Sequence, residues 1–229
     1  MVDIHTHLLM LIEKDNLSLE KFIEILKHQY SLGITDVFLT PHHRTNENKY
    51  SKKEIVKIYN QILNNVKNID GLPKLYLGQV NLCEKNIYSR EEKGEIITLS
   101  DSNAVLLEYN VADYDVVDFV YNFTVLGYTP IIAHAERHLH IDEHTITSIK
   151  LNGGLIQISA PSVIGCMGKP VQKFVLKLIK KGLVDFIASD FHLENEFLLK
   201  DAYDFINKKF KRKVADDLFI NNAKKYILK

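Results

Sequence analysis

The sequence predicts an α/β fold in which seven parallel strands close into a barrel. Short apolar runs of strand length alternate along the chain with amphipathic stretches of helical period, which is typical of βα units. The 229 residues contain no Gly/Ser-rich or Pro-rich linker and no clear repeat, so we expect one domain spanning residues 1–229. Polar residues follow the ends of several of the strand-like runs, which favours a barrel.

The strand candidates are apolar on nearly every position, as expected where helices cover one side of a parallel sheet and a packed interior fills the other. We expect strands at residues 2–5, 34–40, 74–78, 104–109, 129–134, 154–159 and 184–189.

Helical patterns lie between the strands, and most of them stop at a glycine, where a helix C-cap belongs. We expect helices at residues 17–32, 51–68, 113–126, 142–152, 170–181, 194–210 and 214–225. Residues 84–99 read as an extra short helix and loop inserted after the third strand.

A doubly wound open sheet is the alternative arrangement of such βα units. It would place its polar site residues at one switch point of the sheet, whereas a barrel collects them from the ends of many strands.

Composition excludes several classes of function. Lys plus Arg equals Asp plus Glu at 29 each, so no global field attracts nucleic acid or an anionic membrane. No apolar run approaches the ~18 residues of a membrane span. The two cysteines, Cys83 and Cys166, form no disulfide framework, and no signal peptide is evident, so we expect a cytoplasmic protein. The basic run at residues 208–213 reads as a solvated helix end, with a weak anionic contact as the alternative.

The opening strand ends with two histidines separated by one threonine. Residues i and i+2 of a strand share a face, so His5 and His7 can reach one point just past its end. Unpaired imidazoles add nothing to a buried strand, whereas a metal ion accounts for both. Solvated or core-capping histidines are the alternative.

The other strand ends repeat this chemistry. TPHH follows the second strand, LLEY ends the fourth, IIAHAERH ends the fifth and IASDFH ends the seventh. Singly, Glu108 could cap a helix, His134 could be a core histidine and Asp190 could be an N-cap. Ring closure would converge them on one cavity, and imidazole with carboxylate but no thiolate suits Zn, Mn or Fe. Because seven ligands exceed the need of one ion, we expect two or three ions.

These segments resemble the successive motifs of the PHP (polymerase and histidinol phosphatase) family. The resemblance is strongest to its bacterial manganese-dependent protein-tyrosine phosphatases of capsular and extracellular polysaccharide synthesis. It also covers ISAPSVIG after the sixth strand and DDLFINNAKKYI near the end. It implies a distorted (β/α)7 TIM-like barrel with a metal site at the carboxyl ends of the strands.

The resemblance also implies residue roles. Metal binding is implied for His5, His7, His42, Glu108, His134, Asp190 and His192. Mn²⁺ is the implied metal, with Fe or Zn as alternatives. Arg137 matches the arginine of the family's H-P-E-R motif, a phosphate contact; a plain salt bridge is its alternative role. His43, His192 or Asp190 would handle protons.

Two positions depart from the family pattern. Where the family has G-x-E, with a glutamate that bridges two metals, this chain has Gly78-Gln79-Val80. Rescue could come from Gln79 or Glu84. Where the family has an acidic P-G-x-D-D-G turn, residues 10–15 read MLIEKD, with Glu13 and Lys14 near the acidic positions. Loss of the bridging carboxylate predicts weaker binding of the metal pair or the absence of one ion, because such a carboxylate offsets repulsion between neighbouring dications. A bridging water or hydroxide is a further alternative.

The implied reaction is hydrolysis of a phosphomonoester in one step. Neither cysteine precedes an arginine in a C-x5-R arrangement, since Ser89 and Gln172 stand at those positions, so we expect no cysteine nucleophile. The implied substrate is a phosphotyrosine-bearing protein tail, such as that of a bacterial tyrosine kinase. A homo-oligomer is compatible with the sequence.

Three other functions share parts of this pattern. A histidinol-phosphate-type phosphatase would have the same barrel and metals. An amidohydrolase would also begin with HxH but should show a lysine or bridging carboxylate after the fourth strand and an eighth strand. A degenerate barrel that binds phosphotyrosine or a partner without catalysis would be favoured by Val80 and Lys14.

Overall fold

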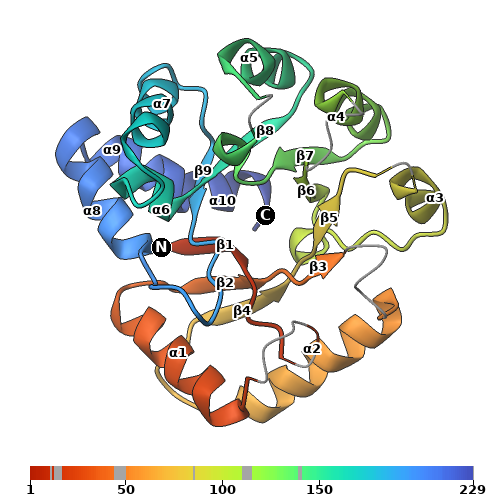
Figure 1. The fold of residues 1–229 in the computed structure, drawn as a ribbon. Helices are drawn as coiled ribbons and strands as arrows, with labels where there is room; N and C mark the ends of the chain where they lie inside the picture. Colours follow the sequence, from red (N-terminus) through yellow and green to blue (C-terminus); the bar gives the residue numbers. More distant parts are fainter. Residues whose placement is uncertain are drawn as a thin grey trace.

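The computed structural model describes residues 1–10, 12, 17–43, 50–84, 86–109, 115–138 and 141–228. A curled parallel sheet forms its centre, and helices surround it (Figure 1). The strands are β1 (Val2–Thr6), β2 (Asp36–Leu39), β3 (His42–His43), β4 (Lys74–Leu77), β5 (Val80–Leu82), β6 (Ala104–Glu108), β7 (Thr129–Ile132), β8 (Leu155–Ser159) and β9 (Phe186–Ala188).

The nine strands form seven staves of the barrel, because a bend divides each of two staves into two consecutive strands. Pro41, which has no N–H to donate, stands between β2 and β3, and Gly78 stands between β4 and β5. A Cβ at Gly78 would lie 2.4 Å from the side chain of Leu99, so only glycine fits at this bend. Hydrogen bonds continue across it, from Gly78 N to Leu39 O (3.0 Å) and from Val80 N to Pro41 O (3.1 Å).

The strand order runs around a ring. One sheet has the order β1-β2-β4 and the other β3-β5-β6-β7-β8-β9, and every pair is parallel. The first and last staves meet through a parallel bridge between Thr6 and Phe191 and a hydrogen bond from Asp190 N to His5 O (3.0 Å). The predicted barrel is therefore confirmed, and the doubly wound alternative is wrong.

Helices form the outer layer of this ring, as Figure 1 shows. The helices are α1 (Leu19–Ser31), α2 (Lys52–Val66), α3 (Ile87–Glu92), α4 (Val116–Val125), α5 (Glu143–Leu151), α6 (Ala160–Ile164), α7 (Lys169–Lys180), α8 (Leu199–Phe210), α9 (Arg212–Asp216) and α10 (Asn222–Tyr226). Of these, α10 lies behind the ring of strands and not around it (Figure 1). Short 3-10 turns lie at η1 (Leu99–Asp101) and η2 (Ala135–Arg137). No helix within the described ranges has the length and apolar character needed to cross a bilayer.

Two expectations about helices were wrong. The helix expected from residue 194 begins at Leu199, because the preceding loop folds back so that the Phe197 ring meets Phe191 edge to face at 5.6 Å. Helix α6, which the sequence did not lead us to expect, begins with Pro161 in its first turn and ends at Gly165, where φ is +95°. The expected start of the helix at 113 lies outside the described residues.

The C-terminal segment closes the end of the barrel opposite the carboxyl ends of the strands. The expected helix at 214–225 is α9 and α10 joined by a π-helical turn, η3 (Asp217–Asn221). Ala223 and Ile227 pack on barrel-interior residues such as Val2 and Phe186. The C-terminus accordingly lies within the ring of strands in Figure 1.

Strand alternation separates two apolar clusters. On β6, Val105 and Leu107 join the large cluster between sheet and helices, whereas Ala104 and Leu106 join the smaller cluster inside the barrel. The position after Leu106 on the inner face is Glu108. Side chains at the carboxyl ends of the strands therefore leave the apolar interior and enter the barrel mouth.

Candidate metal centre

On three strands, the alternation of side chains places a polar residue at the barrel mouth, two positions after a residue of the apolar interior. Glu108 stands two residues after the interior Leu106, Gln157 two after Leu155, and Asp190 two after Ala188. On β1 the register shifts between Asp3 and Thr6, so simple alternation does not hold there.

One group of ligands consists of His5, His134 and Asp190, all buried, with ligand atoms within 4.8 Å of one another. His134 and Asp190 follow β7 and β9 with φ of +32° and +51°. Non-glycine residues adopt this conformation at a cost of roughly 1–2 kcal/mol. Hydrogen bonds hold it, from His134 N to Gln157 Oε1 (2.9 Å) and from Asp190 N to His5 O (3.0 Å).

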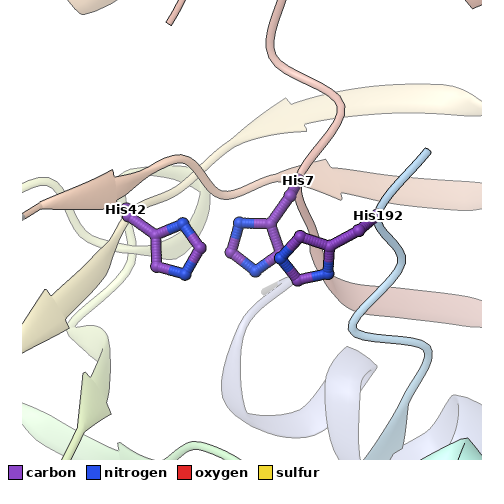
Figure 2. A group of neighbouring side chains, drawn as sticks. All are labelled: His7, His42 and His192. Atoms are coloured by element: carbon purple, nitrogen blue, oxygen red, sulfur yellow. The ribbon is translucent and has the colours of Figure 1, made fainter. Parts of the chain in front are cut away.

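A second group consists of His7, His42 and His192 (Figure 2), again with ligand atoms within 4.8 Å of one another. The His7 ring lies between the other two, with ring centroids 3.9 Å from His42 and 4.1 Å from His192. His7 is buried, whereas His42 and His192 are half-buried and form the more accessible side of the cluster.

The two groups are contiguous. His7 Nε2 lies 3.0 Å from His5 Nε2 and 3.1 Å from Asp190 Oδ1, and His5 Nε2 lies 3.3 Å from the same carboxylate oxygen. Glu108 Oε1 joins the edge of the cluster, 3.9 Å from His134 Nε2. The structure thus brings together all seven side chains for which the resemblance implies metal binding.

Gln157 determines the tautomer of His5. Its Nε2 donates to Ile158 O (2.8 Å) and its Oε1 accepts from His134 N (2.9 Å), which fixes the orientation of the amide. His5 Nδ1, 3.1 Å from the same Oε1, must therefore carry the proton and donate. The lone pair of His5 Nε2 is then directed toward His7 and Asp190, as in a metal ligand with an outer-shell acceptor.

His192 follows the same rule. Its Nδ1 lies 3.0 Å from the carbonyl oxygen of Asp190, which can only accept, so Nδ1 donates and Nε2 presents a lone pair.

Burial keeps several of these imidazoles neutral. It lowers the pKa of His5 to about 3, places the pKa of His134 well below its usual value, and lowers that of His192. For Asp190, burial acts in the opposite sense, but the neighbouring His5, His7 and Arg137 outweigh it and lower its pKa. Neutral imidazoles with an ionised carboxylate are the protonation states that metal ions require.

This donor set fits divalent cations. Imidazole nitrogens and carboxylate oxygens without thiolate suit Mn, Fe or Zn. The lone pair of His5 Nε2 is buried and faces an ionised carboxylate, an arrangement that a cation stabilises. The grouping into two sets of three supports more than one ion.

Arg137 lies at the rim of the cluster, on η2. Its Nη1 is 2.5 Å from Asp190 Oδ2, and its side chain is 32% exposed against 3% for the carboxylate. The guanidinium therefore contacts a candidate ligand on one side and solvent on the other, a position from which it can bind an incoming anion.

His43 is placed differently. His42 aligns with the inward-facing Val80, whereas His43 aligns with Asn81 on the opposite side of the strand. Burial and the nearby Arg90 lower its pKa to about 4. Neither metal-ligand group within the described part of the chain includes His43, so this geometry does not support the proton-handling role expected of it.

The segment that departs from the family pattern is apolar in the structure as well. Val80 is 1% exposed and belongs to the interior cluster with Leu106 and Ile131. Gln79 faces away from the cluster, since its Oε1 accepts from Arg90 Nη2 (3.3 Å). Residues 13–16, which include Glu13 and Lys14, lie outside the described residues.

Two supporting residues were missed in the sequence. Gln157 was missed although a glutamine within the apolar strand GLIQIS is itself a signal of a buried hydrogen-bonding role. Glu136 was noted only as part of a motif. Its Oε1 accepts from Ser159 N (3.0 Å), Ser159 Oγ (2.5 Å) and Ser162 Oγ (2.7 Å), so it ties the turn that carries Arg137 to β8 and α6.

Comparison with known proteins agrees with this geometry. Residues 1–228 match the family described as capsular polysaccharide synthesis, CpsB/CapC. The CapC protein of Staphylococcus aureus is 36% identical over 214 residues, which cover 89% of this chain and 82% of the relative. The tyrosine-protein phosphatase CpsB of Streptococcus pneumoniae is 29% identical over 240 residues, covering 100% of this chain and 98% of the relative.

Solved structures give the same result. The structure of YwqE from Bacillus subtilis and CpsB from Streptococcus pneumoniae, described as unique metal-dependent tyrosine phosphatases, superposes with a TM-score of 0.85 at 25% identity, covering 94% of this chain and 90% of the other. A D-hydantoinase shares the fold alone, with a TM-score of 0.58 at 11% identity over 95% of this chain and 68% of that one. The chain belongs to the CpsB/CapC capsular polysaccharide synthesis family.

Proposed function

We propose that this protein is a metal-dependent protein-tyrosine phosphatase that acts in capsular or extracellular polysaccharide synthesis. The observation that carries the proposal is the cluster of five histidines and two carboxylates at the barrel mouth, with Arg137 beside it. Its relatives in the family bear the same activity in their names. We further infer that the metal is Mn²⁺ and that the substrate is the phosphotyrosine-bearing tail of a bacterial tyrosine kinase.

Each side chain has a role in this proposal. His5, His134 and Asp190 would hold one ion, and His7, His42 and His192 another, with Glu108 at the edge. When bound, divalent ions act as Lewis acids toward phosphoryl oxygens and generate a nucleophile near neutral pH. Arg137 would bind two phosphoryl oxygens through its guanidinium fork and stabilise their charge as the ester bond breaks.

The protonation states favour an aryl phosphate. His5, His134 and His192 have lowered pKa values, so at neutral pH they hold no extra proton to give to a leaving group. Tyrosine, with a pKa of about 10, leaves with less protonation than an alkyl alcohol. These three imidazoles therefore provide no imidazolium donor, which suits phosphotyrosine better than phosphoserine.

The thiols are unsuited to act as nucleophiles. Cys83 is buried, and burial raises the pKa of its thiol, while Cys166 is exposed on the loop between α6 and α7. Neither belongs to a candidate metal group in the described part of the chain.

Hydrolysis of matched phosphotyrosyl and phosphoseryl peptides with added Mn²⁺ tests the proposal. We expect selective phosphotyrosine turnover that survives substitution of both cysteines by alanine. Arg137→Ala should lower kcat/KM by about 100-fold, with Arg137→Lys retaining part of it. Loss of turnover in the double cysteine variant, or equal rates on both peptides, would contradict the proposal.

Val80 supports a second candidate function, a barrel that binds phosphotyrosine without hydrolysing it. Its apolar side chain stands where the family pattern places a bridging glutamate, and it is packed in the interior. This candidate predicts saturable binding of a phosphotyrosyl peptide with no release of phosphate at any metal concentration.

A further inference from the structure

A basic groove lies on the outside of the barrel between α7 and the end of α8. It has a volume of about 570 Å³. Its lining is Lys169, Gln172, Lys173, Leu176, Lys177, Lys180, Lys209 and Phe210. The five lysines are exposed, whereas Leu176 and Phe210 are half-buried and form an apolar floor.

The charge of this groove is concentrated and mostly unpaired. Lys177 forms an ion pair with Glu143 (2.6 Å). None of the other four groove lysines has a carboxylate within 4.0 Å among the described residues. The chain as a whole has equal numbers of acidic and basic residues, so this local excess is not a by-product of composition.

Stabilisation of the helix does not account for the row of three lysines along α7, which we call the lysine row. Lys169, Lys173 and Lys177 are four residues apart, a spacing at which like charges repel and destabilise a helix. Lys169 also begins α7, which has no acidic residue in its first turn and no side-chain N-cap. A cation there adds to the positive end of the helix dipole. These residues together create a positive potential at this end of the groove.

The start of α7 is connected to the end of the barrel that carries the metal-ligand cluster. Helix α6 follows the carboxyl end of β8, and four residues separate the end of α6 from the start of α7. Helix α7 also contacts η2, the turn that carries Arg137. Its first residues therefore lie on the side of the barrel where the metal-ligand cluster opens.

We propose that this groove binds an acidic, partly apolar segment of a protein partner. Carboxylates of the segment complement the lysine row, and its apolar side chains cover Leu176 and Phe210. A uniform polyanion would leave that apolar floor uncovered. The proposal rests on the proposed function in one respect, namely that the bound segment belongs to the phosphotyrosyl substrate and presents its tyrosine to the barrel mouth.

Charge reversal on α7 tests the binding step. The variant pair Lys169→Glu/Lys173→Glu has a matched control in Lys53→Glu/Lys57→Glu, two exposed lysines with the same spacing on α2. The probe is a fluorescent peptide that alternates glutamate and leucine, followed by anisotropy. We expect the α7 variant to raise its Kd about tenfold and the α2 control to leave it unchanged, with the difference shrinking as salt increases.

Other probes distinguish the partner class. Dextran sulfate or phosphatidylglycerol vesicles that bind as tightly as the peptide, with the same loss in the α7 variant, would overturn the assignment to a protein segment. Equal loss in both variants would show a general charge effect and would also overturn it, as would failure of the peptide to bind the parent protein.

Kinetics separate this proposal from the proposed function. For a phosphotyrosyl peptide with the acidic and apolar extension, the α7 variant should raise KM about tenfold at unchanged kcat. Turnover of para-nitrophenyl phosphate, which is too small to reach the groove, should be the same in parent and variant. If neither substrate is hydrolysed, the proposed function fails, while the anisotropy result still decides whether the groove binds the segment.

Discussion

Gln157 shows how one side chain organises the candidate centre. A single amide oxygen accepts from the backbone of His134 and from the ring of His5, which come from different strands. This contact fixes a strained backbone and an imidazole tautomer together. The residue contacts no reacting group, so its effect on function must pass through the ligands that it positions.

Replacing Gln157 by leucine should therefore weaken metal binding. We expect metal affinity to fall about 10–100-fold and the free energy of unfolding to fall by about 1–3 kcal/mol, because a buried N–H and an imidazole donor lose their acceptor. Calorimetric titration with Mn²⁺ and thermal unfolding measure the two effects.

Gln29 provides the matched control. It is fully buried on α1, and neither of its side-chain polar atoms has a hydrogen-bond partner among the residues that the structure describes. Gln29→Leu should leave metal affinity unchanged and should not lower stability. Metal affinity in Gln157→Leu equal to that of the parent would contradict a positioning role.

Val80 is a second residue at which a substitution should change metal binding. A glutamate there should destabilise the chelator-treated protein by about 1–3 kcal/mol, since it places a carboxyl in an apolar cluster. With Mn²⁺ present, the same variant should gain metal affinity and phosphatase activity, whereas Val80→Gln should show the loss without the gain. Thermal shift with and without Mn²⁺ tests this; weaker Mn²⁺ binding in Val80→Glu than in the parent would refute it.

Residue positions were predictable where strand alternation operates without interruption. Glu108 and Asp190 stand two residues after side chains that face the barrel interior, so their place at the mouth follows from the sequence. The same alternation, applied to His42 and His43, would have separated them. It fails for His5 because β1 shifts register, which depends on pairing with a distant segment and leaves no local signal.

At the scale of elements, the turn η2 depends on Glu136. Its Oε1 accepts three hydrogen bonds, and burial raises the pKa of the carboxyl. Its Oε2 is buried and has no hydrogen-bond partner within the described part of the chain. The hydrogen bonds stabilise the turn, whereas the buried charge does not.

Glutamine at position 136 should therefore keep the turn, and alanine should loosen it. Glu136→Gln retains an acceptor oxygen, so we expect stability within about 1 kcal/mol of the parent or above it. Glu136→Ala loses all three bonds and should cost about 2–4 kcal/mol. Urea unfolding at neutral pH measures both, and similar stability of the two variants would contradict this role of Glu136.

Most helices and strands could be predicted from the periodicity of apolar residues and from the glycines that end the helices. The elements that were predicted wrongly or not at all depend on tertiary contacts. The late start of α8 follows from the contact between Phe191 and Phe197, and α6 is a short helix whose Pro161 start carries no amphipathic period. The bend between β4 and β5 depends on the fit of Gly78 against Leu99, which only the folded packing reveals.

At the scale of the whole molecule, the protein buries histidines in their neutral form. Burial is the main reason that the pKa of His5 is about 3 and those of His43 and His138 about 4. Unfolding exposes these rings and returns them to an ordinary pKa of about 6.5. The unfolded chain therefore binds more protons than the folded one between these values.

Stability of the chelator-treated protein should fall with acidity across this window. The contribution of the histidines is fully present above about pH 6.5 and is lost as the pH falls toward about 4. Asp3, Glu136 and Asp185 oppose it, because burial raises their pKa values, whereas the lowered pKa values of His134 and His192 act in the same sense as those of the three histidines. Urea unfolding between pH 7 and 4.5 measures the slope.

Exposed histidine provides the comparison for this pH dependence. His138→Gln should flatten the slope, whereas His144→Gln, exposed at the start of α5, should not. Stability that is flat or that rises on acidification would contradict the lowered pKa values of the buried histidines.

The barrel as a whole was predictable because histidine and carboxylate residues follow the ends of most of its strands. In a closed parallel sheet these ends lie at one mouth of the barrel. What could not be predicted is how the ring closes, since the bridge between Thr6 and Phe191 joins residues from opposite ends of the chain. That closure brings His7 and Asp190 within 3.1 Å. The site is thus a property of the closed molecule.

The central claim is that this cluster binds divalent metal ions and that phosphate ester hydrolysis depends on them. The most direct measurement is native mass spectrometry of metal stoichiometry, taken across a Mn²⁺ titration of the chelator-treated protein together with turnover of para-nitrophenyl phosphate. We expect turnover that rises with the bound metal and reaches its maximum with at least two ions per chain, and that disappears in His7→Ala. Full turnover in the chelated, metal-free protein, or full metal occupancy in His7→Ala, would contradict the claim.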